Sequence, residues 1–443
     1  MEKIINDVIN AALNSVKPEV FLKKSISFKD GFLKINQNTY DSNDYAHIYV
    51  ISIGKAGQTM AAVLSEILGE HISGGLILTK HIDFKIPVAP NFQIMTGGHP
   101  VPTQESILAA KRIVEFLKAT TEKDLIIFLI SGGGSSLLCL PEKGISLSEM
   151  QLCTRALLSC GANIQEINTL RKHLDQIKGG GLALKAAPSH MITLILSDVI
   201  GSPVDAIASG PTVPDPTTFQ DALNILIKYN LQDKMPVSIF HTLEKGVLGK
   251  IPETLKPENP IAKLNNCFVL AENYTAARAA ADTAEMNGYH SLILTESLAG
   301  EASVVGSNMA GILKELSRPD SKIKRPALII LGGETTVKLR GNGVGGRNEE
   351  TALGAVKEMS NLQHCTLVTL ATDGEDGCSE AAGAIVNGET YQRGIDLGLT
   401  PDDFLRKNDS RNYFYKLNDL IITGSSGTNV NDLTFLFLFS NND

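Results

Sequence analysis

Short apolar runs alternate with amphipathic segments along most of this chain. The runs at 48–53 and 125–130 are almost entirely apolar, which is typical of strands buried on both faces of a parallel sheet. Segments such as 104–118 instead repeat apolar residues every three or four positions, the spacing of an amphipathic helix. Because the two kinds of segment alternate, and glycine-rich turns follow several of the runs, the pattern predicts an α/β fold.

The same pattern gives the expected elements. We expect strands at 48–53, 75–79, 93–96, 125–130, 191–196, 267–271, 290–294, 327–331, 335–339 and 365–371, with a final strand near the C-terminal end. We expect helices at 4–24, 60–64, 104–118, 147–160, 164–176, 182–186, 219–229, 274–287 and 301–316.

The length of 443 residues favours two domains, since single cores rarely grow this large. Three prolines within 246–260 make that segment the best linker candidate. We therefore expect an N-terminal α/β domain over 1–245 and a C-terminal α/β domain over 261–443. The final strand could return to the first domain.

Composition narrows the classes of partner. A net charge of −8, without a dense basic run, argues against nucleic acid and anionic membrane surfaces. Aromatic residues make up only 5% of the chain and Trp is absent, which disfavours a surface on which single-stranded nucleic acid or sugars would stack. The six cysteines form no Cys-x-x-Cys pair, and no apolar run approaches a membrane span. The N-terminal residues are polar and show no signal-peptide pattern. Together these features predict a cytoplasmic protein with reduced thiols.

The strongest chemical signal is the turn from Ser131 to Ser136, where three glycines stand between serines directly after a buried strand. Glycines let backbone N–H groups approach an anion closely, and a following helix N-terminus adds partial positive charge. The alternative is a tight strand-to-helix turn without a ligand. Three glycines in a row favour the anion site.

Two more charged residues follow predicted strands. Lys55 ends the strand at 48–53, without a Walker A pattern around it, and Asp198 follows the strand at 191–196. Ligands of open α/β sheets bind beyond the carboxyl ends of the strands. We therefore expect Lys55, the Ser131 turn and Asp198 to converge on one rim, unless Lys55 merely reaches solvent.

The segment 341–346 matches G-x-G-x-x-G, and Arg347 follows its last glycine. The acidic residue expected about 20 positions later in a dinucleotide site is missing, and the preceding strand candidate is polar. A phosphate contact through Arg347 is therefore favoured over a nicotinamide site. A purely structural loop remains the alternative.

Further polar residues lie in turns near strand ends. Asp198, Asp373 and Asp376 suit Mg²⁺, which prefers oxygen ligands. One of these carboxylates could instead accept a hydroxyl proton, and Asp376 could merely stabilise its turn. His99 and His173 are weaker general-base candidates. The segment 425–429 resembles another anion-binding turn, with a docking loop as its alternative. Cations, glycine turns and strand-end carboxylates together are what phosphoryl transfer requires.

At this point the sequence resembles the glycerate 2-kinase family, whose C-terminal part is the MOFRL domain. The resemblance runs in order over nearly the whole chain. It is carried by the motifs at 131–136, 171–174, 177–180, 207–218, 332–334, 340–349, 372–377, 381–384 and 427–433. It implies ATP- and Mg²⁺-dependent phosphorylation of D-glycerate at its 2-hydroxyl. It also implies a Rossmann-like three-layer first domain with a mainly parallel sheet, and an active site in the interdomain cleft.

The resemblance also assigns residues. The family's essential lysine falls on Lys55, its essential arginine on Arg347 and a strand-end aspartate on Asp198. Asp373 and Asp376 remain metal candidates on the strand-end argument above. The matched motifs supply the substrate- or nucleotide-binding candidates Ser131, Gly132, Gly133, Gly134, Ser135, Ser136, Lys178, Glu334, Gly345, Gly346, Asn348, Thr428 and Asn429.

Two departures from the family pattern are visible. Gly181 stands where relatives usually carry Arg, and Ser425-Ser426 stands where a proline is common. The expected partners are the small molecules D-glycerate and ATP, and a homodimer is compatible with this interpretation. The alternatives are an NAD(P)H-dependent hydroxypyruvate reductase and a non-catalytic nucleotide or sugar-acid binding protein.

Overall fold

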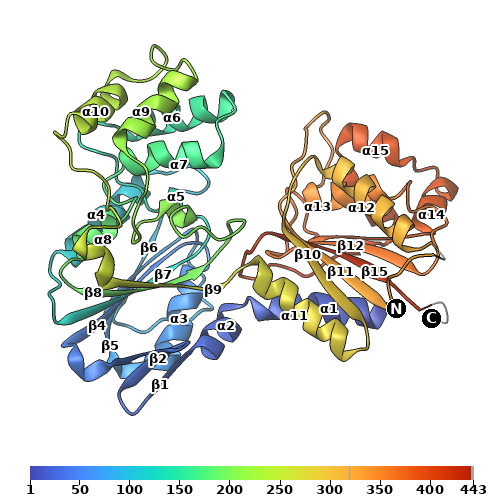
Figure 1. Ribbon diagram of the computed structural model, residues 1–443, viewed down its shortest axis with the longest axis horizontal. Helices are drawn as coiled ribbons and strands as arrows, with labels where there is room; N and C mark the ends of the chain where they lie inside the picture. Colours follow the sequence, from blue (N-terminus) through green and yellow to red (C-terminus); the bar gives the residue numbers. More distant parts are fainter. Residues whose placement is uncertain (319, 441–443) are drawn as a thin grey trace. The chain divides into compact units, whose positions relative to one another are not determined.

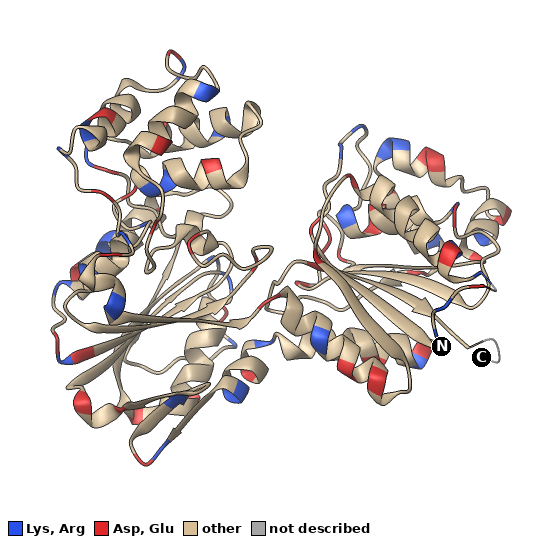
Figure 2. Cartoon of the chain, viewed as in Figure 1, with Lys and Arg blue, Asp and Glu red and all other residues tan. Residues whose placement is uncertain are grey.

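The computed structural model describes residues 1–318 and 320–440, and its contacts divide the chain into two compact units (Figure 1). Unit 2 consists of Phe21–Ser197 and Ser202–Leu270. Unit 1 consists of Met1–Val20, Asp198–Gly201 and the chain from Ala271 onward. Lys and Arg are interspersed with Asp and Glu over both units (Figure 2). Within the described residues, no helix is long and apolar enough to cross a membrane.

Unit 2 is built on a six-stranded sheet with the order β6-β5-β4-β7-β8-β9. The pairs from β6 to β8 are all parallel, which confirms the expected mainly parallel, Rossmann-like sheet. The central β7 is buried at every position, as its unbroken apolar run predicted. The strands are β4 (His47–Ile53), β5 (Ile72–Thr79), β6 (Phe92–Thr96), β7 (Asp124–Ile130), β8 (His190–Leu196) and β9 (Asn265–Ala271).

The helices of unit 2 pack around this sheet and in a separate cluster. Four of them, α6, α7, α9 and α10, enclose a hydrophobic core of their own. The helices are α2 (Pro18–Ser25), α3 (Gly57–Leu68), α4 (Gln104–Leu117), α5 (Gly134–Leu137), α6 (Leu147–Ser159), α7 (Ile164–His173), α8 (Gly181–Ala186), α9 (Phe219–Lys228) and α10 (Val237–Val247). Short 3-10 turns are η1 (Ser42–Asp44), η2 (Gly69–His71), η3 (Ile207–Ser209) and η4 (Pro260–Leu264).

Unit 2 also contains a small antiparallel sheet that the sequence pattern did not reveal. Its strands are β1 (Ile26–Lys29), β2 (Phe32–Ile35) and β3 (Asn38–Asp41). These strands are four residues each, and their buried positions are only Ile26 of β1 and the alternate positions Leu33 and Ile35 of β2. So short a pattern gives little periodicity to detect.

Unit 1 is built on a mixed six-stranded sheet with the order β10-β11-β15-β12-β13-β14. Helices α1 and α11 lie on one face, and α12 and α13 on the other (Figure 1). The strands are β10 (His290–Leu298), β11 (Ala327–Gly333), β12 (Cys365–Ala371), β13 (Gly383–Asn387), β14 (Leu420–Ile421) and β15 (Asp432–Leu438). The helices are α1 (Glu2–Ser15), α11 (Asn273–Met286), α12 (Ala302–Leu316), α13 (Arg347–Ala355), α14 (Thr390–Asp396), α15 (Pro401–Lys407) and α16 (Ser410–Leu417).

The N-terminal segment differs from the expected helix over 4–24. It forms two helices, because Pro18 begins α2 and cannot continue the hydrogen bonding of α1. Helix α1 belongs to unit 1, where the Ser15 hydroxyl lies 3.4 Å from the Thr275 carbonyl of α11. The first residues of the chain thus pack with its C-terminal half.

The proline-rich segment 246–260 is not a free linker. Leu255 is buried, its N–H donates to Gly179 at 2.9 Å, and its carbonyl accepts from Asp215 at 2.7 Å. Strand β9, which was expected to open the second domain, lies in the sheet of unit 2. The chain changes unit after Leu270. The prolines suggested an earlier boundary because they mark irregular backbone, but irregular backbone can still be packed within a unit.

Two further expectations fail in unit 1. The strand expected at 335–339 is absent, and Thr336 makes only an isolated bridge with Glu301. The final strand does not return to the sheet of unit 2. As β15, it pairs antiparallel with both β11 and β12 in the middle of the unit 1 sheet.

Candidate active site

In unit 2, the turn carrying Lys55 and the Ser131 turn lie side by side. They follow β4 and β7, which are paired in register up to Ile53 and Ile130. The Lys55 N–H donates to the Gly132 carbonyl at 2.9 Å, and the Ser131 hydroxyl accepts from the Ala56 N–H at 3.1 Å. These bonds fix the two turns to each other and leave the Lys55 side chain exposed.

Glycines are required where the turns touch. Gly54 has φ +132°, and a Cβ there would collide with the Ser131 hydroxyl. Gly133 has φ +83°, and a Cβ there would lie 2.9 Å from His99 Cδ2 and 3.2 Å from Lys55 Cγ. The missing side chain of Gly133 therefore allows Lys55 and His99 to lie close to each other.

His99, which sequence left as a weak general-base candidate, is placed beside Lys55. Burial, followed by the positive charges of Lys55 and Lys80, lowers the pKa of His99 to about 4. The imidazole is therefore neutral at neutral pH. His173 is placed differently: it is buried, with Nδ1 2.8 Å from the Thr169 carbonyl and Nε2 3.3 Å from Glu253. Its contacts are those of a structural histidine.

Several predicted binding residues of this turn support its backbone. The buried Lys178 ammonium donates to the carbonyls of Ser135 at 2.9 Å and Leu138 at 2.5 Å. The Ser136 hydroxyl donates to the Gly133 carbonyl at 3.1 Å. Ser135 and Ser209 hydroxyls lie 3.0 Å apart. Lys178 thus holds the glycine turn in shape and does not offer its charge to solvent.

Asp198 does not group with the sheet whose strand it follows. Strand β8 ends at Leu196, and Asp198–Gly201 belongs to unit 1. Its side chain is partly exposed. The expectation of a single rim therefore holds in unit 2 for Lys55 and the Ser131 turn.

In unit 1, Arg347 is the first residue of α13 and meets two carboxylates. Its Nε and Nη2 donate to Asp432 at 2.5 and 3.1 Å, and Nη1 lies 2.8 Å from Glu334. Burial lowers the pKa of the guanidinium, but the Asp432 hydrogen bond and the charges of Asp432 and Glu334 outweigh it and raise the pKa. Arg347 is therefore a fixed cation at the start of a helix.

The N-terminus of α13 is capped by Asp376. One carboxylate oxygen accepts from the Asn348 N–H at 3.1 Å and the other from the Glu349 N–H at 2.8 Å. Burial raises the pKa of Asp376 to about 6 and that of Glu349 to about 8. Both oxygens of Asp376 thus have structural partners, which does not suit a metal ligand. Asn348 also contacts Asp376 through its amide, at 3.3 Å.

The glycines of 341–346 are explained by packing. A Cβ on Gly341 would meet Lys407, one on Gly345 would meet the Ser410 hydroxyl, and one on Gly346 would meet Asp376. No regular strand precedes the loop. The strand–turn–helix geometry of a nicotinamide site is therefore not present around this motif.

The predicted anion turn near the C-terminal end is also tied to its own unit. The Thr428 hydroxyl donates to the Val16 carbonyl at 2.8 Å, and the Asn429 side chain accepts from the Asn431 N–H at 2.9 Å. Ser426 donates from its N–H to the Asp373 carbonyl at 3.0 Å. Asp373 itself is partly exposed, so one carboxylate near this turn could meet a metal together with substrate oxygens. Among the described residues, no group of three or more His, Cys, Asp or Glu forms a metal cluster.

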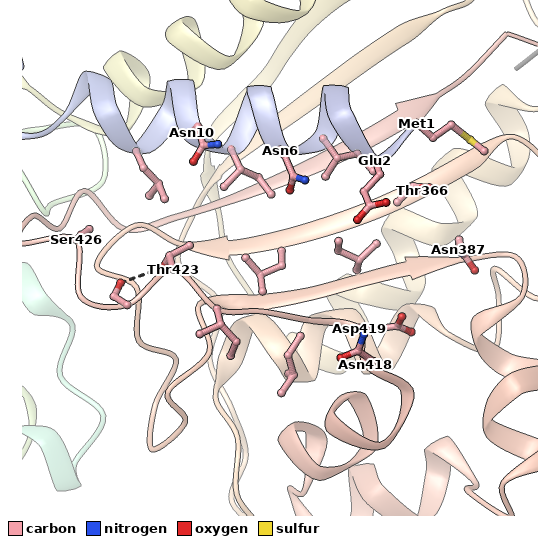
Figure 3. A pocket seen from close by; sticks show the side chains of 18 of the residues that line it. Met1, Glu2, Asn6, Asn10, Thr366, Asn387, Asn418, Asp419, Thr423 and Ser426 are labelled. Carbon is pink, nitrogen blue, oxygen red and sulfur yellow. Dashed lines mark hydrogen bonds between the residues drawn. The ribbon is translucent and has the colours of Figure 1, made fainter.

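A cavity of about 930 Å³ lies in unit 1 between α1 and the β12–β14 side of the sheet. Asn6 and Asn10 of α1 face it from one side, and Asn418 and Asp419 from the other (Figure 3). Ser426 stands at one end. Of the predicted sites, only the C-terminal anion-binding turn reaches this cavity, through Ser425 and Ser426.

Comparisons with known proteins cover residues of both units. Residues 4–244 match a family described as a domain of unknown function, and residues 327–432 match the MOFRL family. A D-glycerate 2-kinase from Thermotoga maritima is 37% identical over 433 residues, covering 98% of this chain and 97% of that protein. The chain belongs to the glycerate 2-kinase family.

Solved structures support the fold of this glycerate 2-kinase family member. The crystal structure of a glycerate kinase from Thermotoga maritima aligns with a TM-score of 0.86 at 36% identity, covering 98% of this chain and 99% of that chain. The family resemblance and the two-domain α/β fold expected from sequence are confirmed. A relative from Agrobacterium vitis, 38% identical over 391 residues and 88% of this chain, carries a hydroxypyruvate reductase name.

Sequence reasoning missed Asp432 as a residue of the candidate site. It lay inside the quoted motif 427–433, but only pairing of β15 between β11 and β12 brings it to Arg347. An acidic residue at the start of an apolar strand was the available signal.

Proposed function

We propose that this protein transfers the terminal phosphoryl group of ATP to the 2-hydroxyl of D-glycerate, giving 2-phosphoglycerate and ADP. The observation that carries the proposal is the 37% identity to a D-glycerate 2-kinase along almost the full length of both chains. Lys55 and Arg347 supply the positive charge that phosphoryl transfer requires, because negative charge develops on the oxygens of the transferring group.

Each unit has a role in this proposal. Lys55 and the backbone of the Ser131 turn hold an anionic group of one substrate, and Arg347 neutralises charge on the transferring phosphoryl group. Asp198 accepts the proton of the 2-hydroxyl. Other predicted binding residues hold the backbone of the site in shape, through close packing or hydrogen bonds. They are Gly345, Gly346, Asn348, Lys178 and Thr428.

The proposal includes Mg²⁺ bound to the nucleotide phosphates. Mg²⁺ usually takes one or two protein carboxylates and completes its shell with phosphate oxygens and water. Asp373 is the protein ligand we propose, while Asp376 keeps its helix-capping role. The ion would neutralise phosphate charge during transfer.

The test is to incubate the purified protein with D-glycerate, ATP and Mg²⁺, and to separate 2-phosphoglycerate from 3-phosphoglycerate. We expect the 2-isomer and ADP in equal amounts, and neither after chelation of the metal. The Arg347→Ala variant should lose most turnover, and normal turnover in it would exclude the charge-neutralising role. Oxidation of NAD(P)H with hydroxypyruvate, without ADP formation, would instead establish the reductase.

The cellular setting follows from the same proposal. We expect a cytoplasmic enzyme, since its substrates are small metabolites and the six cysteines are free thiols. A homodimer remains a prediction, and light scattering of the purified protein at several concentrations would decide it.

A further inference from the structure

We propose that Asp432 is the positioning residue that holds Arg347 for phosphoryl transfer, leaving the Nη1–Nη2 edge of the guanidinium for an anionic substrate group. This inference rests on the proposed function. It adds a residue with a role of its own to the site, and it explains why the arginine is flanked by two carboxylates of different exposure.

The pairing with Asp432 is two-pronged and side-on. Nε and Nη2 of Arg347 donate to the two oxygens of Asp432 at 2.5 and 3.1 Å. Two parallel charge-assisted bonds fix the plane of a guanidinium as well as its position. Nη1 then points away from Asp432 and meets Glu334.

Asp432 is itself rigidly held. It begins β15 and is paired with Gly333 of β11 and Ala371 of β12. The Asn273 side chain donates to its carbonyl at 3.0 Å and to the Val430 carbonyl at 2.9 Å. Only 10% of the Asp432 side chain is exposed, so its carboxylate has little room to move.

Glu334 is the contrasting partner. It follows β11, its side chain is 44% exposed, and a single contact of 2.8 Å joins it to Nη1. A substrate phosphate or carboxylate can replace so exposed a carboxylate, because surface ion pairs contribute little stability. Glu334 thus marks the direction from which an anion approaches Arg347.

Helix stability alone does not account for this arrangement. A cation at the first position of α13 is disfavoured by the helix dipole, and Asp376 already caps the helix. An arginine held at this end by a buried carboxylate is explained by a ligand that needs a fixed cation there.

The experiment is a double-mutant cycle between Asp432→Asn and Arg347→Lys, with kcat measured for D-glycerate and ATP. Asn keeps the shape of Asp432 and removes its charge, and Lys cannot form the two-pronged pair. We expect Asp432→Asn to lower kcat about 10–100-fold, the usual cost of removing the support of a functional side chain. In the Arg347→Lys background the same change should cost about threefold or less, because the interaction is already lost.

A matched control is Asp419→Asn. Asp419 pairs with Arg393 at 2.6 Å in the same unit, with 14% of its side chain exposed, and it should leave kcat unchanged. Unchanged kcat in Asp432→Asn, or costs that simply add in the double variant, would overturn the inference and indicate a purely structural ion pair.

Failure of the proposed function and misfolding of the variant give different results from failure of the inference. A wild-type protein that forms no 2-phosphoglycerate would refute the proposed function, and the inference with it. Should Asp432→Asn melt below the assay temperature, Asp432→Glu takes its place. That variant keeps the charge but displaces the carboxylate, and it must show the same coupling with Arg347→Lys.

Discussion

At the scale of residues, the polar side chains of the glycine-rich motifs divide into two groups. Lys178, Asp376 and Thr428 each form hydrogen bonds with backbone groups of their own unit. Lys55 is exposed, and Arg347 keeps one edge toward a part-exposed carboxylate. We expect ligands to bind to Lys55 and Arg347. The residues of the first group would have to break their hydrogen bonds with the backbone before they could bind a ligand.

His99 gives a prediction at this scale. Its pKa is about 4 in the folded protein and about 6.5 when unfolded, so between these values the unfolded state binds the extra proton. The His99 contribution to stability is complete above pH 6.5 and is lost as the pH falls toward 4. His99→Gln should therefore lose less stability than wild type between pH 7 and pH 4.5, as measured by urea unfolding.

The exposed His81 serves as the control. His81→Gln should follow the wild-type pH dependence. Identical curves for His99→Gln and wild type would show that the imidazole near Lys55 titrates normally.

At the scale of elements, each site depends on two segments that meet at strand ends. The turn after β4 touches the turn after β7 through Gly54 and Ser131, with no space for a side chain between them. In unit 1, α13 begins where Asp376 and Asp432 converge from other elements. A small shift of one of these elements would therefore move the charged side chains of the element that it contacts.

Gly54→Ala should disrupt the first contact. Its Cβ would overlap the Ser131 hydroxyl in a conformation, φ +132°, that side chains rarely adopt. We expect a loss of about 3 kcal/mol or more in unfolding free energy, and at least tenfold lower turnover. Gly69→Ala is the control: it also has positive φ, +56°, but nothing lies within 4 Å, so it should show only the backbone cost of about 1–2 kcal/mol. Equal losses would refute the steric explanation.

Glu349 gives a second prediction for α13. Its pKa is raised to about 8 by burial, so the folded protein holds a proton that the unfolded chain releases above about pH 4.5. The contribution of Glu349 to stability should therefore fall as the pH rises from about 4.5 to 8. Glu349→Gln mimics the protonated form, and at pH 8 it should be more stable than wild type by about 1 kcal/mol or more.

Unfolding in guanidinium chloride at pH 5 and pH 8 measures this difference. The exposed Glu358→Gln should change neither value beyond error. A Glu349→Gln protein that is less stable than wild type at pH 8 would show that the carboxylate is ionised and paired.

At the scale of the whole molecule, segments distant in sequence complete each unit. Helix α1 packs against α11, and the chain's last strand, β15, lies between β11 and β12. The N-terminal segment and the C-terminal half are therefore expected to unfold together, although some 250 residues of unit 2 separate them.

Deletion of residues 1–15 tests this dependence. It removes the buried side chains Ile4, Ile5, Val8, Ile9 and Leu13 and should cost on the order of 10 kcal/mol, at about 1.5–3 kcal/mol for each large side chain. Hydrogen exchange followed by mass spectrometry should become faster in α11 and remain unchanged in α4. Faster exchange in α4 would instead assign α1 to the N-terminal unit.

Much of the fold was predictable because it depends on local patterns. The strands around β4, β7, β8, β11 and β12 are buried on both faces, so their apolar runs identify them directly. The glycine turns after them indicated Lys55, the Ser131 turn and Arg347. Short strands such as β1 and the alternating surface of β10 were missed or shortened, since they lack a long period.

The sequence by itself determined the α/β class, the resemblance to the glycerate 2-kinase family and the residues that carry charge near strand ends, because these are properties of adjacent positions. Only the tertiary structure decided that α1 and β15 belong to one unit, that Lys178 and Asp376 support backbone, and that Asp432 holds Arg347. These depend on strand order and side-chain direction across elements far apart in the chain, which local composition does not encode.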